Sequence, residues 1–138
     1  MTGQKPHPVE LINYFFTEQT VRANPDHQAN NDCIMESRMT THVAPLPNGS
    51  HACELTIELD DDKSTNPSYF YRVVAYGIFS VSENLEEEKI DEFIQKTSIQ
   101  ILTGVIRERL AEITSRGPWR QVLLRIASIP HGLLQPDK

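Results

Sequence analysis

The sequence predicts an α+β domain in which a four-stranded antiparallel sheet is followed by one long helix that packs on it. Three observations support this fold class. Four segments show the two-residue alternation or the β-branched and aromatic content of strands, and no helical pattern separates them. A single long amphipathic segment follows the last strand pattern. An abrupt stop, Ser115-Arg116-Gly117-Pro118, then ends that segment.

The first half of the chain predicts three strands. The first is expected at Leu11–Arg22, which is rich in aromatic and β-branched residues. Residues 23–32 are polar and contain a proline, so they predict a connection long enough to cross over other elements. A hairpin is expected next, with strands at Ile34–Val43 and His51–Leu59 and the turn pair Asn48-Gly49 between them.

The fourth strand is expected at Tyr69–Val81, and it is apolar on both faces. One face carries Tyr71, Val73 and Ala75, and the other carries Phe70 and Val74. A strand with one face in water would carry polar residues on that face. We therefore expect both faces of this strand to be covered.

The helix is expected to begin after Asn84 and to be closed by Gly117 in the left-handed conformation. Acidic residues gather in its first turns and arginines lie at or beyond its far end, which the helix macrodipole favours by about 0.3 to 1 kcal/mol per well-placed charge. Its apolar stripe is wide enough to contact more than one neighbour. Gly104 lies inside the helix, which predicts that the backbone of another helix comes close there.

The size of the chain fits one domain, residues 1–138, with flexible ends at 1–9 and 131–138. After the stop, residues 119–130 are expected to form an extended segment or short helix packed on this domain. The chain has 13 Lys and Arg against 19 Asp and Glu, a net charge of -6, which argues against nucleic acid as the main partner. No apolar run is long enough to span a membrane and no secretory apolar core is found, so we expect a cytoplasmic protein.

Residues that could carry out chemistry are few. The two cysteines form no Cys-x-x-Cys pair, and neither has the local signature of a nucleophile. The glycines are scattered and form no phosphate-binding loop. His42, His51 and Cys53 could meet across the hairpin as metal ligands, but no fourth ligand is evident. We therefore expect no enzyme, no cofactor and no metal.

Motifs in the second half of the chain resemble the bacterial export chaperone SecB and its relatives. They are Tyr76-Gly77-Ile78-Phe79-Ser80-Val81, then Ile101-Leu102 leading to Arg107-Glu108, and finally Ser115-Arg116-Gly117. The resemblance covers residues 11–130 and is strongest over 69–117. It implies a homo-oligomer, either a dimer or a tetramer built as a dimer of dimers. In such an assembly the long helices lie between two sheets, and apolar grooves hold unfolded polypeptide without nucleotide.

The resemblance also leads to three sets of candidate residues. The candidates for binding unfolded polypeptide clients are Tyr14, Phe16, Trp119, Val122 and Leu124. The candidates for the oligomer interface are Tyr71, Val73, Ala75, Ile101 and Val105. The candidates for an outer sheet surface that meets a partner are Arg22, Phe70 and Arg72. Relatives carry acidic residues there that engage the translocase motor SecA, and the arginines at 22 and 72 should repel its basic tail.

Three functional hypotheses follow from the sequence. The first is an ATP-independent holdase-type chaperone linked to protein export, whose groove is formed by the sheet edge, the helix and the segment after Gly117. The second keeps the fold but serves a single partner, such as one antitoxin. The third is a small-molecule or metal-binding protein that uses His42, His51 and Cys53.

Overall fold

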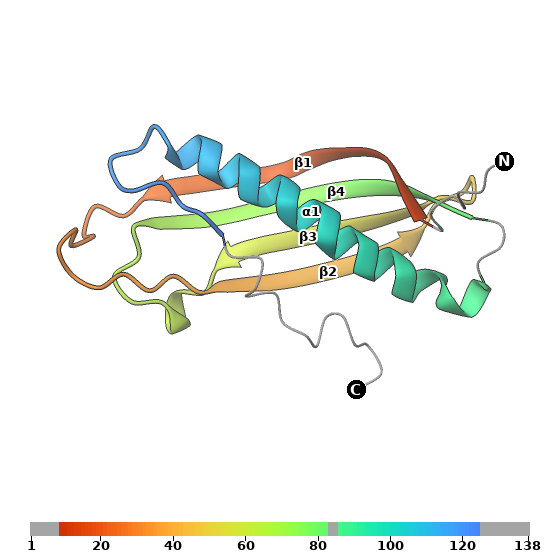
Figure 1. Cartoon of the computed structure of the whole chain (residues 1–138), viewed down its shortest axis with the longest axis horizontal. Coiled ribbons are helices and arrows are strands. Elements are labelled where there is room, and N and C mark those ends of the chain that lie inside the picture. Colours follow the sequence, from red (N-terminus) through yellow and green to blue (C-terminus); the bar gives the residue numbers. More distant parts are fainter. Residues whose placement is uncertain (1–8, 83–85, 125–138) are drawn as a thin grey trace, which may run out of the picture.

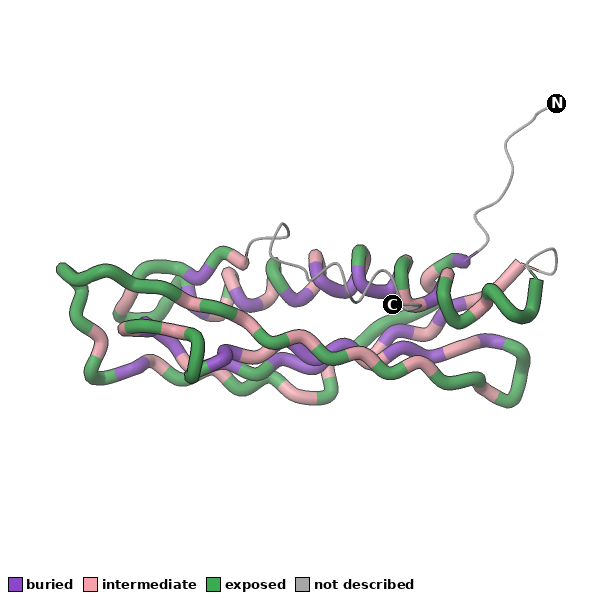
Figure 2. Tube along the Cα trace, turned by 90° about the horizontal axis from the view of Figure 1, so that it is seen from below, coloured by how far each residue is buried: buried purple, intermediate pink, exposed green. Residues whose placement is uncertain are grey.

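The computed structural model describes residues 9–82 and 86–124, which form a sheet with one helix on one of its faces (Figure 1). The predicted α+β class is confirmed, and the strands and helix come in the predicted order. Buried residues gather between the helix and the sheet, as Figure 2 shows. The elements are β1 (Val9–Ala23), β2 (Ser37–Pro45), β3 (His51–Leu59), β4 (Tyr69–Val81) and α1 (Ile90–Thr114).

The sheet is antiparallel throughout, with the strand order β1-β4-β3-β2. Because β1 and β2 lie at opposite edges, residues 24–36 cross the end of the sheet as the polar connection predicted. Asn66 fixes this crossover to the turn before β4. Its backbone has a positive φ of 53°, and its side-chain amide bonds the main chain of Gln28 (2.8 and 2.9 Å) and Asp32 (3.1 Å).

Two strand boundaries differ from the prediction. β2 begins at Ser37 because Ile34 instead forms an isolated bridge with Thr65, so the chain pairs with the turn before β4 at this point. β1 begins at Val9, which is buried against α1 and belongs to the sheet, so the predicted flexible end 1–9 is wrong at this residue. The other terminal residues predicted to be flexible, 1–8 and 131–138, lie outside the described residues, as does Asn84.

The core lies between one face of the sheet and α1. Side chains at a spacing of three and four along α1 meet alternate residues of β3 and β4, because a helix presents one stripe and a strand one face. Each fully buried aliphatic side chain contributes about 1.5 to 3 kcal/mol. The fully buried members of the main cluster are Leu55, Val73, Ala75, Leu102, Ile106 and Leu110.

The second face of β4 is not covered by another layer in the described part of the chain, so cover on both faces would require another copy. The apolar residues on this face are shielded from within the sheet instead. The ring of Phe15 on β1 stacks on Tyr76 with 5.2 Å between the centroids. The guanidinium of Arg22 lies 4.6 Å from the centroid of Phe70. The apolar pattern on this face therefore does not by itself require a second subunit.

The ends of α1 agree with the prediction only in part. Acidic residues Asp91 and Glu92 occupy its first turn, as expected, but its last turn contains no basic residue, so the arginines do not act on the helix dipole there. Gly117 does not have a positive φ, which contradicts the predicted left-handed closure. Its lack of a side chain has another cause, because a Cβ at this position would overlap the Tyr69 hydroxyl group.

Candidate functional site

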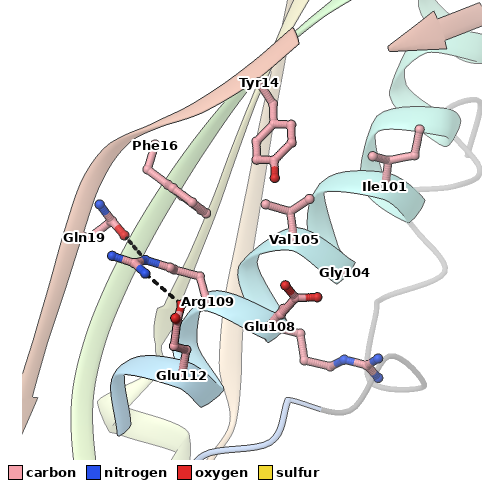
Figure 3. Close-up of a pocket in the computed structure, with 10 residues that line it drawn as sticks. Tyr14, Phe16, Gln19, Ile101, Gly104, Val105, Glu108, Arg109 and Glu112 are labelled. Carbon is pink, nitrogen blue, oxygen red and sulfur yellow. Dashed lines mark hydrogen bonds and ion pairs between the residues drawn. The ribbon is translucent and has the colours of Figure 1, made fainter. Parts of the chain in front are cut away.

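A groove of about 590 Å³ lies between the edge strand β1 and α1 (Figure 3). It exists because α1 crosses the sheet diagonally, from β2 near its start to β1 near its end (Figure 1). Two hydrogen bonds mark this path: Gln95 donates to Thr41 on β2, and Arg109 donates to Gln19 on β1. The residues that line the groove are Tyr14, Phe16, Gln19, Ile101, Gly104, Val105, Arg107, Glu108, Arg109 and Glu112.

The middle of the groove is apolar and open. Tyr14 and Phe16 contribute aromatic rings that meet edge to face at 6.3 Å between centroids, and the ring of Tyr14 points toward Val105 (Figure 3). A Cβ at Gly104 would meet no other atom within 4 Å. No other segment of this chain therefore comes close to Gly104, so a helix that packs there, as predicted, would have to belong to another copy. Within a single copy, the missing side chain deepens the groove.

One end of the groove is polar. The Arg109 guanidinium donates hydrogen bonds to Gln19 Oε1 at 2.5 Å and to Glu112 Oε1 at 2.7 Å, and so connects α1 to β1. The groove thus combines an aromatic and aliphatic middle with a polar end, and it contains no nucleophile. This arrangement suits the binding of apolar side chains.

The edge of β1 lies beside the groove. An edge strand presents unpaired backbone N–H and C=O groups, to which another extended chain can add. One of these donors is already used, because the Tyr14 N–H bonds the Asn13 side chain at 2.9 Å. Two register shifts in β1, between Leu11 and Asn13 and between Phe16 and Glu18, confine regular pairing to short stretches.

The predicted peptide-binding residues divide into two groups. Tyr14 and Phe16 line the groove, where they lie opposite Ile101 and Val105, which were predicted for the oligomer interface. Trp119, Val122 and Leu124 lie outside it and pack against the core of the same chain, with Val122 only 8% exposed. These last three do not line this groove, because the chain folds back after α1 and packs them on the core, where Val122 is buried and Trp119 and Leu124 are partly buried.

The interface candidates from β4 are also corrected. Tyr71, Val73 and Ala75 face α1 of the same chain and are at most 4% exposed, so they cannot contact another copy directly. Tyr71 is further held by a hydrogen bond of 2.5 Å between its hydroxyl and that of Ser37. Only Ile101 and Val105 of this set keep partly exposed side chains.

A row of ion pairs crosses all four strands on the outer face of the sheet. Arg72 on β4 bonds Glu18 on β1 at 3.0 Å and Glu58 on β3 at 3.1 Å, and Arg38 on β2 approaches Glu58 and Asp60 at 3.6 and 3.9 Å. The hydrogen bond to Glu18 raises the pKa of Arg72. Carboxylates flank Arg72, so this surface is not a basic patch. The repulsion between Arg72 and a positively charged SecA tail, expected from the sequence, is therefore not supported.

The proposed metal ligands do not come together. Residues that pair directly across the hairpin share a face of the sheet, and successive residues alternate between faces. His42 pairs with Glu54 and the next residue, Val43, pairs with Cys53, so His42 lies on the outer face and Cys53 lies under α1. Burial raises the pKa of the Cys53 thiol, so the thiol stays neutral and unreactive. Within residues 9–82 and 86–124, no group of three or more His, Cys, Asp or Glu side chains could hold a metal.

Several groove residues were not predicted from the sequence. Glu108 and Glu112 follow Ile101 and Val105 at helical spacing, so the stripe on α1 could have indicated them. Gln19 has no such signal, because its place depends on a register shift in β1.

Comparison with known proteins gives a structural likeness alone. No protein-family model and no curated protein matches the sequence. The structure is similar to the SecB-like chaperone Rv1957 of Mycobacterium tuberculosis, solved in complex with a ChAD peptide from the HigA1 antitoxin Rv1956. The TM-score is 0.72 at 14% sequence identity, over 89% of this chain and 93% of the other. A protein of unknown function from Streptococcus agalactiae matches with a TM-score of 0.49 at 11% identity, over 85% of this chain and 96% of the other.

None of the described helices has both the length and the apolar character needed to cross a membrane.

Proposed function

Because the chain has a SecB-like fold, we propose that it is an ATP-independent, holdase-type chaperone of the cytoplasm. It binds apolar segments of unfolded polypeptides and keeps them from aggregating. The observation that supports this proposal best is the groove beside β1, where Tyr14 and Phe16 face Ile101 and Val105 across an open Gly104. Burial of client side chains supplies the affinity, about 25 cal/mol per Å² before the costs of ordering.

The edge of β1 gives the client a defined path. An extended segment that pairs with the outward backbone groups of β1 would place alternate side chains on the face of Tyr14 and Phe16. Those side chains would enter the groove, whereas the residues between them would lie on the outer face. Main-chain pairing is independent of sequence, so the groove would select for apolar side chains and tolerate most other features of the client.

Suppression of aggregation tests this proposal. Wild-type protein should reduce the light scattering of a diluted, denatured client, and Gly104→Phe should lose this activity. The Cβ has open space at this position, and the ring attached to it would occupy the groove. The matched control is Thr40→Leu, which adds apolar surface on exposed β2. Wild-type protein that leaves aggregation unchanged, or equal activity in Gly104→Phe, would contradict the proposal.

A second candidate function is a chaperone dedicated to one partner. The observation that favours it is the Rv1957 structure, whose described ligand is an antitoxin peptide. A single groove of this size also accommodates only a few side chains. Affinity capture from the host separates the two: a general holdase should retain many polypeptides, and a dedicated one mainly a single species.

We infer that a role in protein export would act through the outer sheet surface. The ion-pair row there contains three carboxylates and two arginines, so it retains a net negative charge that a basic tail could meet. Binding of purified SecA should then weaken when Glu18 is changed to Lys. Absence of any binding by the wild type would remove the link to export.

A further inference from the structure

The segment after α1, residues 117–124, is called the strap. Its first anchor is Trp119, whose indole Nε1–H donates to the Asn24 carbonyl in the crossover at 3.0 Å. The Trp119 backbone N–H donates to the Tyr69 hydroxyl at 3.2 Å, and the His27 ring meets the indole edge to face at 4.9 Å. The strap is thus held to the crossover and to the start of β4.

The second anchor is at the end of α1. The Val122 backbone N–H donates to Thr114 Oγ1 at 2.8 Å, and the Gln121 side-chain amide donates to the Ala111 carbonyl at 2.9 Å. Residues 121–124 belong to no helix or strand. The main-chain donors of Trp119 and Val122 are therefore satisfied by side-chain hydroxyl groups rather than by secondary structure.

This arrangement has the features of a bound peptide. Three apolar side chains of the strap pack on the apolar core cluster. They are the aromatic Trp119, the aliphatic Val122 three positions later, and Leu124 five positions after Trp119. Two hydroxyl groups on the receiving surface accept main-chain N–H bonds, which any residue except proline can donate. An extended segment from another polypeptide could make the same contacts.

Opening the strap requires only local changes. It breaks a few hydrogen bonds and exposes three apolar side chains and the core surface beneath them, without disrupting a strand or the helix. When a binding surface is free in only a fraction of molecules, the apparent affinity for a competitor is reduced by that fraction. Weakening an anchor should therefore increase the affinity for an external peptide.

We propose that the strap occupies a second peptide-binding surface as an internal competitor, and that extended client segments with the same aromatic and aliphatic spacing displace it. This inference rests on the proposed function, and it adds a site and its regulation. The three residues predicted to bind clients are then the built-in occupant of that site.

The test uses a fluorescein-labelled peptide with the strap's own sequence, residues 119–124, and fluorescence polarisation. Trp119→Phe keeps an aromatic ring but removes the Nε1–H donor, and Gln121→Ala removes the side-chain donor to the Ala111 carbonyl. Both changes lie in the strap and leave the receiving surface intact. Each loses one hydrogen bond of the closed strap, so each should bind the peptide about 2- to 10-fold more tightly than wild type. The matched control is Leu123→Ala, since Leu123 is 67% exposed, and it should bind like wild type.

Hydrogen exchange provides a second measurement. Excess unlabelled peptide should speed the exchange of the Trp119 and Val122 amides, because the peptide holds the strap open. Unchanged or slower exchange, or wild-type affinity in both anchor variants, would overturn the inference.

The two proposals can fail separately. If wild-type protein suppresses aggregation through the groove while the anchor variants bind no more tightly, the strap is ordinary structure and the proposed function stands. If the anchor variants bind more tightly but the wild type never suppresses aggregation, the strap surface is real and the chaperone function is wrong.

Discussion

Gly104 and Gly117 both lack a side chain, but the structure requires a glycine only at position 117. Around Gly104 there is open space on the groove side of α1, whereas Gly117 packs against the Tyr69 hydroxyl. Neither has a positive φ, so backbone conformation explains neither glycine. Substitution by alanine should therefore have opposite effects at the two positions.

We expect Gly104→Ala to raise the free energy of unfolding by up to about 1 kcal/mol. Alanine restricts the unfolded chain more than glycine does and meets nothing at this site. Urea denaturation followed by circular dichroism measures the change. A loss of stability instead would show that an atom from outside this chain lies close to Gly104.

Gly117→Ala should lower the free energy of unfolding by about 1 to 3 kcal/mol, because the new Cβ overlaps the Tyr69 hydroxyl and forces a shift in a packed region. The double variant with Tyr69→Phe should recover part of this loss. No recovery in the same denaturation experiment would mean that the overlap is not the cause.

The pH dependence of stability follows from Cys53 and Tyr71. Burial is the main reason that the pKa of each rises above its ordinary value, 9.0 for the thiol and 10.0 for the phenol. The unfolded chain therefore releases these protons at lower pH than the folded chain does. Stability should be fully present below pH 9 and should fall as the pH rises through 9 and above.

Denaturation midpoints between pH 7 and 11 check this expectation. Cys53→Ala should flatten the fall that starts near pH 9, and Leu123→Ala, which leaves both groups in place, should not. A wild-type midpoint that stays constant over this range would contradict the assignment.

At the scale of the elements, the sequence predicts those features that depend on residues close together in the chain. The β2–β3 hairpin follows from Asn48-Gly49 between alternating segments, and α1 from its apolar stripe. The start of β2 was missed because Ile34 pairs with Thr65, a contact between residues far apart in sequence. The sequence predicts a left-handed backbone at Gly117, whereas the close packing of the Tyr69 side chain is what requires a glycine there.

The candidate site was predictable only in part for a similar reason. Tyr14 and Phe16 stand out as aromatic residues of the first predicted strand, and Ile101 and Val105 as part of a wide helix stripe. That these four face each other depends on the diagonal path of α1, which sequence periodicity does not specify. The position of Trp119 depends on hydrogen bonds to Asn24 and Tyr69, and no local pattern indicates them.

At the scale of the whole molecule, we expect a homo-oligomer in which a second copy packs on the edge of β1 and on Ile101 and Val105. These residues also line the groove, so assembly and client binding should compete for this surface. Light scattering should give two or four times the 15.7 kDa mass of the chain. Ile101→Asp should reduce that mass, because it places a charge on the surface that would be buried. A strictly monomeric wild type would remove the oligomer from the account, although the groove would remain.

The central claim is that clients bind in the groove between β1 and α1. Site-specific photo-crosslinking tests it most directly, with a benzophenone side chain introduced at position 101 in the groove or at position 40 on the outer face of β2. A denatured client should form covalent adducts with the protein labelled at 101 and not at 40, and Gly104→Phe should reduce those adducts. Equal adducts at both positions, or adducts only at position 40, would contradict the claim.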